Sequence, residues 1–157
     1  MTQQSKKSKI PKMKLELVKS TDPILRRRTA DVHLDLLRSS YLADLIASMT
    51  EISRGFEGIA ANQVGINLRL AIVQRVTSDP WILINPVIVS FGESQKTELE
   101  GCLNFRWTQR RKRRSKNLIL ATLDLDGQPN YYDVSGMAAR IVQHEVDHLK
   151  GKIITDR

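Results

Sequence analysis

The chain has 157 residues, of which 41% are hydrophobic and 27% charged, and its formal net charge is +8. These values are typical of one globular domain with an ordinary core. No apolar run approaches the roughly 20 residues of a membrane span, and the N-terminus lacks the apolar stretch of a secretory signal. The single cysteine, Cys102, excludes an intramolecular disulfide. We therefore expect a cytoplasmic protein with no membrane partner.

The predicted elements follow a lysine-rich tail. Residues 1–14 are polar and contain five lysines and one proline, so we expect a disordered basic tail there and a single domain over residues 15–157. From Leu34 to Met49, apolar residues recur at helical spacing and predict one amphipathic helix. The next stretch, RGFEGIAANQVG (54–65), contains three glycines and has neither a helical nor a strand period. We interpret it as a loop in which backbone segments approach closely.

The second half of the chain predicts strands followed by one helix. Residues 68–74 and 81–90 are β-branched runs of strand length, the second broken by Pro86. Residues 117–134 read as two strands joined at an Asp-Gly turn. A helix of about four turns then runs from residue 137 to a glycine cap at Gly151. Strands that cluster before one late helix favour the α+β class.

The last predicted helix contains the pattern HEVDH at residues 144–148. Residues four apart share one helix face, so His144 and His148 can bind one metal ion while Glu145 lies beside it. In this HExxH arrangement the carboxylate accepts a proton from a water bound to the metal. The alternative is a helix with surface or satisfied core histidines. That alternative is disfavoured because burying three unpaired polar groups on an apolar helix is costly.

The third metal ligand must come from an upstream segment. Only nine residues follow His148, and among them Asp156 alone could coordinate, beyond the predicted end of the helix. The remaining histidine, His33, lies far upstream. The segment ELEGCLNF (98–105) offers Cys102, whose thiol a metal ion would deprotonate. We therefore predict Cys102, His144 and His148 as the ligands.

This ligand set predicts a catalytic site and not a structural one. Three protein ligands leave the fourth tetrahedral position open for water, whereas structural zinc sites are normally closed. The bound water, with its pKa lowered to about 7, would be the nucleophile. Glu145 would act first as its general base and then as the proton donor.

Three blocks of the sequence resemble the peptide deformylases, and they occur in that family's order. They are GIAANQVG (58–65), EGCLN (100–104) and QHEVDHLKG (143–151), with weaker similarity at 22–32 and 84–88. The similarity runs from about Leu15 to Asp156. It implies an α+β fold in which a central HExDH helix is surrounded by antiparallel or mixed β-sheets. It also implies a hydrolase that removes the formyl group from the N-terminal formylmethionine of nascent polypeptides.

The resemblance also assigns roles to individual residues. It supports the three metal ligands and the acid/base role of Glu145. Gln63, through its side chain, and Leu103, through its backbone N–H, would donate hydrogen bonds to the developing oxyanion. Gly58 would bring backbone close to the substrate, and Glu100 and Asp147 would support the metal site from behind. The family usually retains ferrous iron, and one thiolate with two imidazoles also suits zinc or nickel.

The sequence departs from the family pattern at two of these blocks. The first motif normally begins Gly, apolar, and these places hold Phe56 and Glu57. The apolar place lines the pocket for the methionine side chain, so we expect Glu57 to contact the substrate and to alter its preference. After Cys-Leu the family usually has Ser, a β-branched residue and often Pro. This chain has Asn104, Phe105 and Arg106 there.

The C-terminal region suggests a short form of the family. The chain stops at Arg157, without the tail that docks many bacterial members on the ribosome, as in members encoded by bacteriophages. The stretch RWTQRRKRRSK (106–116) holds seven Lys or Arg in eleven residues, and we predict it as a substitute ribosome contact. Its alternative interpretation is a solvated basic loop or edge strand.

Two other functions fit part of the sequence. An HExxH metallopeptidase with a cysteine ligand would share the metal site. A basic RNA- or ribosome-binding module would use the metal only structurally. The open coordination position, with Gln63 beside it, favours the deformylase, which we expect to be a monomer acting on N-formylmethionyl peptides.

Overall fold

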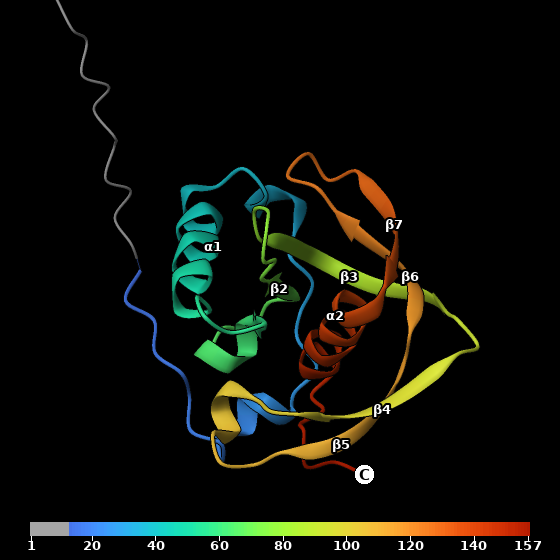
Figure 1. Cartoon of the computed structure of the whole chain (residues 1–157). Helices are drawn as coiled ribbons and strands as arrows, with labels where there is room; N and C mark the ends of the chain where they lie inside the picture. The colour runs from blue at the N-terminus through green and yellow to red at the C-terminus, as the bar shows by residue number, and fades with distance from the viewer. Residues whose placement is uncertain (1–12) are drawn as a thin grey trace, which may run out of the picture.

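Helix α2 (Gly136–Leu149) lies at the centre of the fold, with strands on several sides of it (Figure 1). The computed structural model describes residues 13–157. The other elements are η1 (Pro23–Arg26), η2 (Leu34–Leu36), α1 (Ser40–Ile52), β1 (Gly58–Ala60), η3 (Ala61–Val64), β2 (Leu70–Val73), β3 (Trp81–Phe91), β4 (Gln95–Glu100), η4 (Leu103–Phe105), β5 (Arg110–Ser115), β6 (Asn117–Leu123) and β7 (Pro129–Ser135). The predicted α+β class is confirmed.

The strands form two antiparallel sheets. One has five strands in the order β1-β2-β3-β6-β7, and the other is the β4–β5 hairpin, which extends beneath α2 in Figure 1. Contrary to expectation, Pro86 does not break β3, because the register of the β3–β6 pair shifts between Ile84 and Val87. Asn85, at φ 50°, lies in this shift, and its side chain bonds both the N–H and the carbonyl of Val32.

Strand β2 is buried on both faces and thereby separates two hydrophobic clusters. Ala71 and Val73 face the cluster that contains the apolar side of α2. Leu70 and Ile72 face the cluster that contains α1. Successive side chains of a strand point to opposite faces, so the run LAIV supplies both clusters. The two helices are consequently held on opposite sides of β2.

Two predicted boundaries were wrong. The helix expected from Leu34 begins at Ser40, because the Ser39 hydroxyl accepts the Leu42 N–H at 3.1 Å and so caps α1 there. Leu34 itself belongs to the separate turn η2. The expected loop 54–65 contains β1 and η3, since Gly58 to Ala60 pair with β2. Such a short strand shows no period of its own.

Strand β4 was not predicted. Its sequence, QKTELE, is polar with one leucine, and it pairs residue by residue with the arginine-rich β5. The basic run 106–116 therefore includes an edge strand, which was one of its two predicted forms. Most of the tail expected at residues 1–14 lies outside the described residues, which begin at Met13. Met13 itself packs against the hydrophobic cluster that contains α1. Within residues 13–157, no helix has the length and apolar character needed to cross a membrane.

Candidate metal centre and active-site pocket

Helix α2 and the segment after β4 bring the three predicted metal ligands together. The Cys102 Sγ lies 3.3 Å from the His148 Nε2, which lies 3.1 Å from the His144 Nε2. One ligand atom from each residue falls within 4.8 Å of the others. The apolar residues of α2 face the core. His144 and His148 are four residues apart and therefore share another face of the helix, which lies next to Cys102. Folding thus brings the two histidines of HEVDH next to Cys102, which precedes His148 by 46 positions.

The spacing of these atoms fits a tetrahedral metal ion. Typical metal–ligand distances of about 2.0–2.1 Å for nitrogen and about 2.3 Å for sulfur put the nitrogens about 3.3 Å apart and sulfur about 3.6 Å from nitrogen. Two of the three observed separations, 3.1 and 3.3 Å, are within a few tenths of these values, and all three atoms lie within 4.8 Å of one another. A thiolate and two imidazoles therefore have both the chemistry and the placement to hold one divalent ion.

Glu100, the last residue of β4, orients His144. Its Oε2 lies 3.1 Å from the His144 Nδ1, so the imidazole donates its Nδ1–H to the carboxylate and directs its Nε2 lone pair toward the other ligands. Arg114 contacts both carboxylate oxygens, at 3.0 and 2.9 Å, and Arg140 contacts one at 2.6 Å. The predicted support from Glu100 is therefore part of a larger network.

Asp147 reaches the same network through Arg114. The Arg114 guanidinium bonds Asp147 as well as Glu100, and its side chain is only 11% exposed. Sequence reasoning missed Arg114 and Arg140. The sequence alone gave no signal for Arg114, because the alternation of Glu98 and Glu100 has meaning only once β4 is known to be a strand paired with β5.

Gln63 is held beside Cys102 by the turn η3, which follows β1 directly. Its Oε1 accepts the Ala60 N–H at 2.8 Å, and its Nε2 lies 3.5 Å from the Cys102 Sγ and 2.7 Å from the Asn104 Oδ1. Leu103, the first residue of η4, has one of the N–H groups that a helix start leaves without an intrahelical partner. Both predicted oxyanion donors are therefore next to the ligand cluster. Asn104, noted from the sequence only as a departure, is the contact that sequence reasoning missed.

Glu145 is 3% exposed, and its Oε2 has no hydrogen-bond partner among residues 13–157. Gly58 of β1 lies directly against it. A Cβ at position 58 would lie 2.6 Å from the Glu145 Oε1 and 2.8 Å from the Ile72 carbonyl oxygen. Only glycine leaves room for the carboxylate at this point of the sheet edge.

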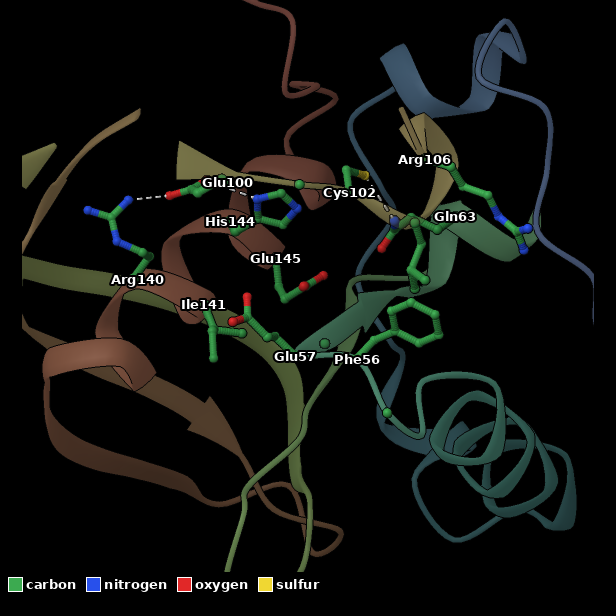
Figure 2. Close-up of a pocket in the computed structure, with 14 residues that line it drawn as sticks. Phe56, Glu57, Gln63, Glu100, Cys102, Arg106, Arg140, Ile141, His144 and Glu145 are labelled. Carbon is green, nitrogen blue, oxygen red and sulfur yellow. Dashed lines mark hydrogen bonds and ion pairs between the residues drawn. The ribbon is translucent and has the colours of Figure 1, made fainter. Parts of the chain in front are cut away.

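These groups open into a pocket of about 540 Å³ (Figure 2). Glu145 points into it, and Glu57 lies on one side near Ile141. Arg106 lies on the other side, beyond Gln63. The pocket is thus lined by charged groups of both signs, with Cys102 and His144 of the ligand cluster in its wall.

Comparison with known proteins agrees with this geometry. A family model described as "Polypeptide deformylase" matches residues 14–157. The chain belongs to the polypeptide deformylase family. Its activity is the removal of the N-formyl group from nascent peptides, and deformylases are metal-dependent hydrolases.

Individual deformylases are similar over most of their length. The peptide deformylase of Dictyoglomus thermophilum is 36% identical over 143 residues, which are 90% of this chain and 91% of that protein. A class I type b peptide deformylase from Acinetobacter baumannii superposes with a TM-score of 0.85 at 34% identity, covering 91% and 98% of the two chains. Another structure of that enzyme is bound to Met-Ala-Ser. A probable peptide deformylase from Synechococcus phage S-SSM7 has a TM-score of 0.81 at 31% identity and covers 91% and 99%.

Burial, hydrogen bonds and neighbouring charges shift the pKa values of the deformylase site's residues when no metal is bound. Burial lowers the pKa of His148 to about 3, which keeps this imidazole neutral. Burial also opposes charge on His144, but hydrogen bonds to Cys102 and Glu100 raise its pKa to about 10. Burial raises the pKa of Glu145 to about 7, against the effect of His144 and with that of Glu57. Without metal, the site therefore favours one positive charge, on the His144 imidazole between Cys102 and Glu100.

Proposed function

We propose that this deformylase holds one divalent ion through Cys102, His144 and His148 and uses Glu145 as its general acid/base. The observation that carries the proposal is the convergence of three ligand atoms within 4.8 Å, with the unpartnered Oε2 of Glu145 on the same helix beside them. We propose Fe²⁺ as the ion, with Zn²⁺ and Ni²⁺ as alternatives that the same ligands accept. When bound, it would polarise the formyl carbonyl and acidify a water molecule.

The residues of the chain would then carry the proton and hold the substrate. Glu145 takes a proton from the attacking water, and delivers it to the amine nitrogen as the C–N bond breaks, giving formate and a free N-terminus. The Gln63 Nε2 and the Leu103 N–H donate to the formyl oxygen as it gains negative charge. Glu100 keeps His144 in one tautomer, and Asp147 supports Glu100 through the Arg114 that both contact.

Gly58 and Glu57 would contact the substrate itself. Gly58 lies at the pocket in β1, an edge strand, so its backbone can approach that of an extended peptide. The Acinetobacter baumannii deformylase binds Met-Ala-Ser, which has the form of a deformylated peptide. By position in the motif, Glu57 replaces an apolar residue beside the methionine side chain. Glu57→Ile should therefore lower the KM for formyl-Met peptides if Glu57 disfavours that side chain, and an unchanged KM would contradict the assignment.

The catalytic proposal is tested by formate release from a formyl-Met peptide under anaerobic, iron-loaded conditions. Glu145→Gln should reduce turnover to the background rate while metal analysis still finds one ion per chain. Glu93→Gln, at an exposed carboxylate in the turn between β3 and β4, is the matched control and should keep full activity. Loss of the ion from Glu145→Gln would instead make Glu145 a ligand or a structural residue. Cleavage inside an unformylated peptide would favour the metallopeptidase alternative.

We further propose that the outward part of the basic segment 106–116 contacts the ribosome. Arg111 and Arg113 are exposed and make no ion pair among residues 13–157, and Trp107 is 98% exposed. Exposed cations with an exposed aromatic ring are suited to a phosphate backbone and unstacked bases. The combined variant Arg111→Ala, Arg113→Ala should weaken salt-sensitive cosedimentation with ribosomes. Arg38→Ala with Arg75→Ala removes two exposed charges from other parts of the chain and should not.

The remaining assignments concern the state of the protein in the cell. We propose a cytoplasmic protein, a location supported by its bacterial relatives and by nascent peptides as substrates. We also propose that the chain is a monomer. Light scattering on the purified chain measures the oligomeric state directly. A dimer at micromolar concentration would contradict the proposal.

A further inference from the structure

Asn104 joins three segments that are far apart in the sequence. Its Nδ2 donates to the Val18 carbonyl at 2.8 Å and to the Gln63 carbonyl at 3.3 Å. Its Oδ1 accepts from the Gln63 Nε2 at 2.7 Å. The Val18 N–H also donates to the Gln63 carbonyl, at 2.9 Å. The segment before η1, the turn η3 and the turn η4 are therefore tied at one side chain.

These contacts determine which way each amide faces. Both neighbours of the Asn104 Nδ2 are carbonyl oxygens, which only accept hydrogen bonds, so the NH₂ group must face them. The Asn104 Oδ1 is then left to face Gln63, and it needs a donor there. Gln63 meets this need with its Nε2 while its Oε1 accepts the Ala60 N–H at 2.8 Å. A flipped Gln63 would place oxygen against oxygen and N–H against N–H.

Of the two hydrogens on the Gln63 Nε2, Asn104 therefore takes one. The other is directed to the Cys102 Sγ at the pocket, 3.5 Å away. Gln63 is only 2% exposed, so water cannot easily replace a lost partner. The usual serine of the family would offer a single short hydroxyl, which cannot make all three contacts of the asparagine amide.

We propose that Asn104 is a positioning residue of this deformylase. It holds the Gln63 amide so that the N–H now directed to Cys102 can donate to the formyl oxygen, and it anchors that amide to the segment at Val18. The inference rests on the proposed role of Gln63 as an oxyanion donor. It adds that the donor is oriented by Asn104, at a position where the family usually has serine.

A double-mutant cycle tests whether Asn104 acts through Gln63. Asn104→Ala, Gln63→Ala and the double variant are assayed for formate release, with kcat, KM and metal content measured for each. Asn104→Ala should lower kcat by about 10- to 100-fold, because a misplaced donor loses most of its effect, with KM and metal content unchanged. In the Gln63→Ala background it should cause no further loss of kcat. Asn67→Ala, which removes an exposed side-chain bond to the Ala30 N–H, is the control and should keep the activity of the unsubstituted chain.

The same four proteins, freed of metal, are compared by thermal unfolding. The Tm loss of the double variant should be smaller than the sum of the two single losses, because each single substitution already removes the same hydrogen bond between Gln63 and Asn104. If Asn104→Ala does not fold, Asn104→Ser replaces it, with a smaller loss of kcat expected. Full activity of the Asn104 variant, or losses that multiply with those of Gln63→Ala, would overturn the proposal. If the unsubstituted chain released no formate, the proposed function would fail, and the Tm cycle alone would still decide whether Asn104 holds Gln63.

Discussion

The two sides of α2 differ in how far their polar groups are satisfied. On the side toward β5, the Gln143 amide bonds the N–H and carbonyl of Ser115 and the carbonyl of Ala139. Arg140 bonds Glu98 and Glu100 and two backbone carbonyls of the β4–β5 hairpin. On the pocket side, the Glu145 Oε2 is buried with no partner among residues 13–157.

This difference separates support from chemistry. A buried polar atom without a partner costs about 1–3 kcal/mol, so a fold tolerates it only where the rest of the element is firmly held. The β5 side provides that hold through paired charges and amide bonds to backbone. On the pocket side, polar groups remain available to bind a metal ion, a water molecule and a substrate.

The largest effect is expected on the β5 side, at Arg114. Arg114→Ala removes the guanidinium that bridges Glu100 and Asp147, and it should lower the free energy of unfolding by about 3 kcal/mol. This is the low end for breaking a buried ion pair, since Arg140 still neutralises Glu100. Metal affinity should fall about 10- to 100-fold, because Glu100 orients His144 less firmly. Denaturant unfolding and metal titration measure the two losses, and unchanged metal affinity would separate this network from the site.

On the pocket side, Gly58→Ala should mainly damage activity. The added Cβ meets the Glu145 Oε1 and the Ile72 carbonyl, so the carboxylate must move. A displacement of about 1 Å typically costs about 100-fold in rate, and overpacking costs about 1–3 kcal/mol of stability. Formate release at equal metal content checks the first value and denaturant unfolding the second. An active variant would show that Glu145 tolerates a different position.

A smaller effect is expected where the supporting side continues past α2, at Asp156. Burial opposes its charge, but the Ile153 N–H and the Arg26 guanidinium lower its pKa below the ordinary 3.8. The folded state thus holds this proton less tightly than the unfolded state. The stabilisation is complete above about pH 3.8 and is lost as pH falls through the lower folded pKa.

Asp156→Asn tests this by comparing unfolding as a function of pH. The variant should be less stable than the unsubstituted chain near pH 6, by less than about 1 kcal/mol, as for an exposed ion pair. The difference should shrink as the pH is lowered below 3.8. A difference that grew on acidification would reverse the sign of the assigned shift.

The smallest effect is expected on the outward face of β5. Arg113 points away from α2 beside Thr97, is exposed and makes no ion pair in the described part of the chain. Arg113→Ala should change the free energy of unfolding by no more than about 0.5 kcal/mol. It is therefore the matched control for Arg114→Ala, one position along the same strand. A loss comparable to that of Arg114 would remove the contrast between the two faces.

The sequence was most informative where function depends on local spacing. His144 and His148 are one helical turn apart, and the scarcity of other donors pointed to Cys102, so the sequence selected three residues that the structure brings together. The α+β class followed from the order of strands and helix. The positions of Gln63 and Leu103 beside the cluster agree with the motif resemblance.

What could not be predicted depends on pairing between segments. The direction of each arginine in β5 is set by its register with β4, and the polar sequence of β4 gave no sign of a strand. Asn104 bonds Val18 and Gln63 across 86 and 41 positions, which no local pattern reports. The start of α1 was misplaced because a single serine cap outweighed a continuing apolar period.

The separation of the ligands along the chain gives the metal site a second consequence. Cys102 and His148 are 46 positions apart, with β5, β6 and β7 between them. An ion held by both residues would close this stretch into a loop, as a disulfide between two cysteines would. By the entropy of such a closure, the cross-link would stabilise the fold by about 4 kcal/mol. Chelation or oxidation of the thiol would open the loop, and the protein would lose a reversible staple together with its catalyst.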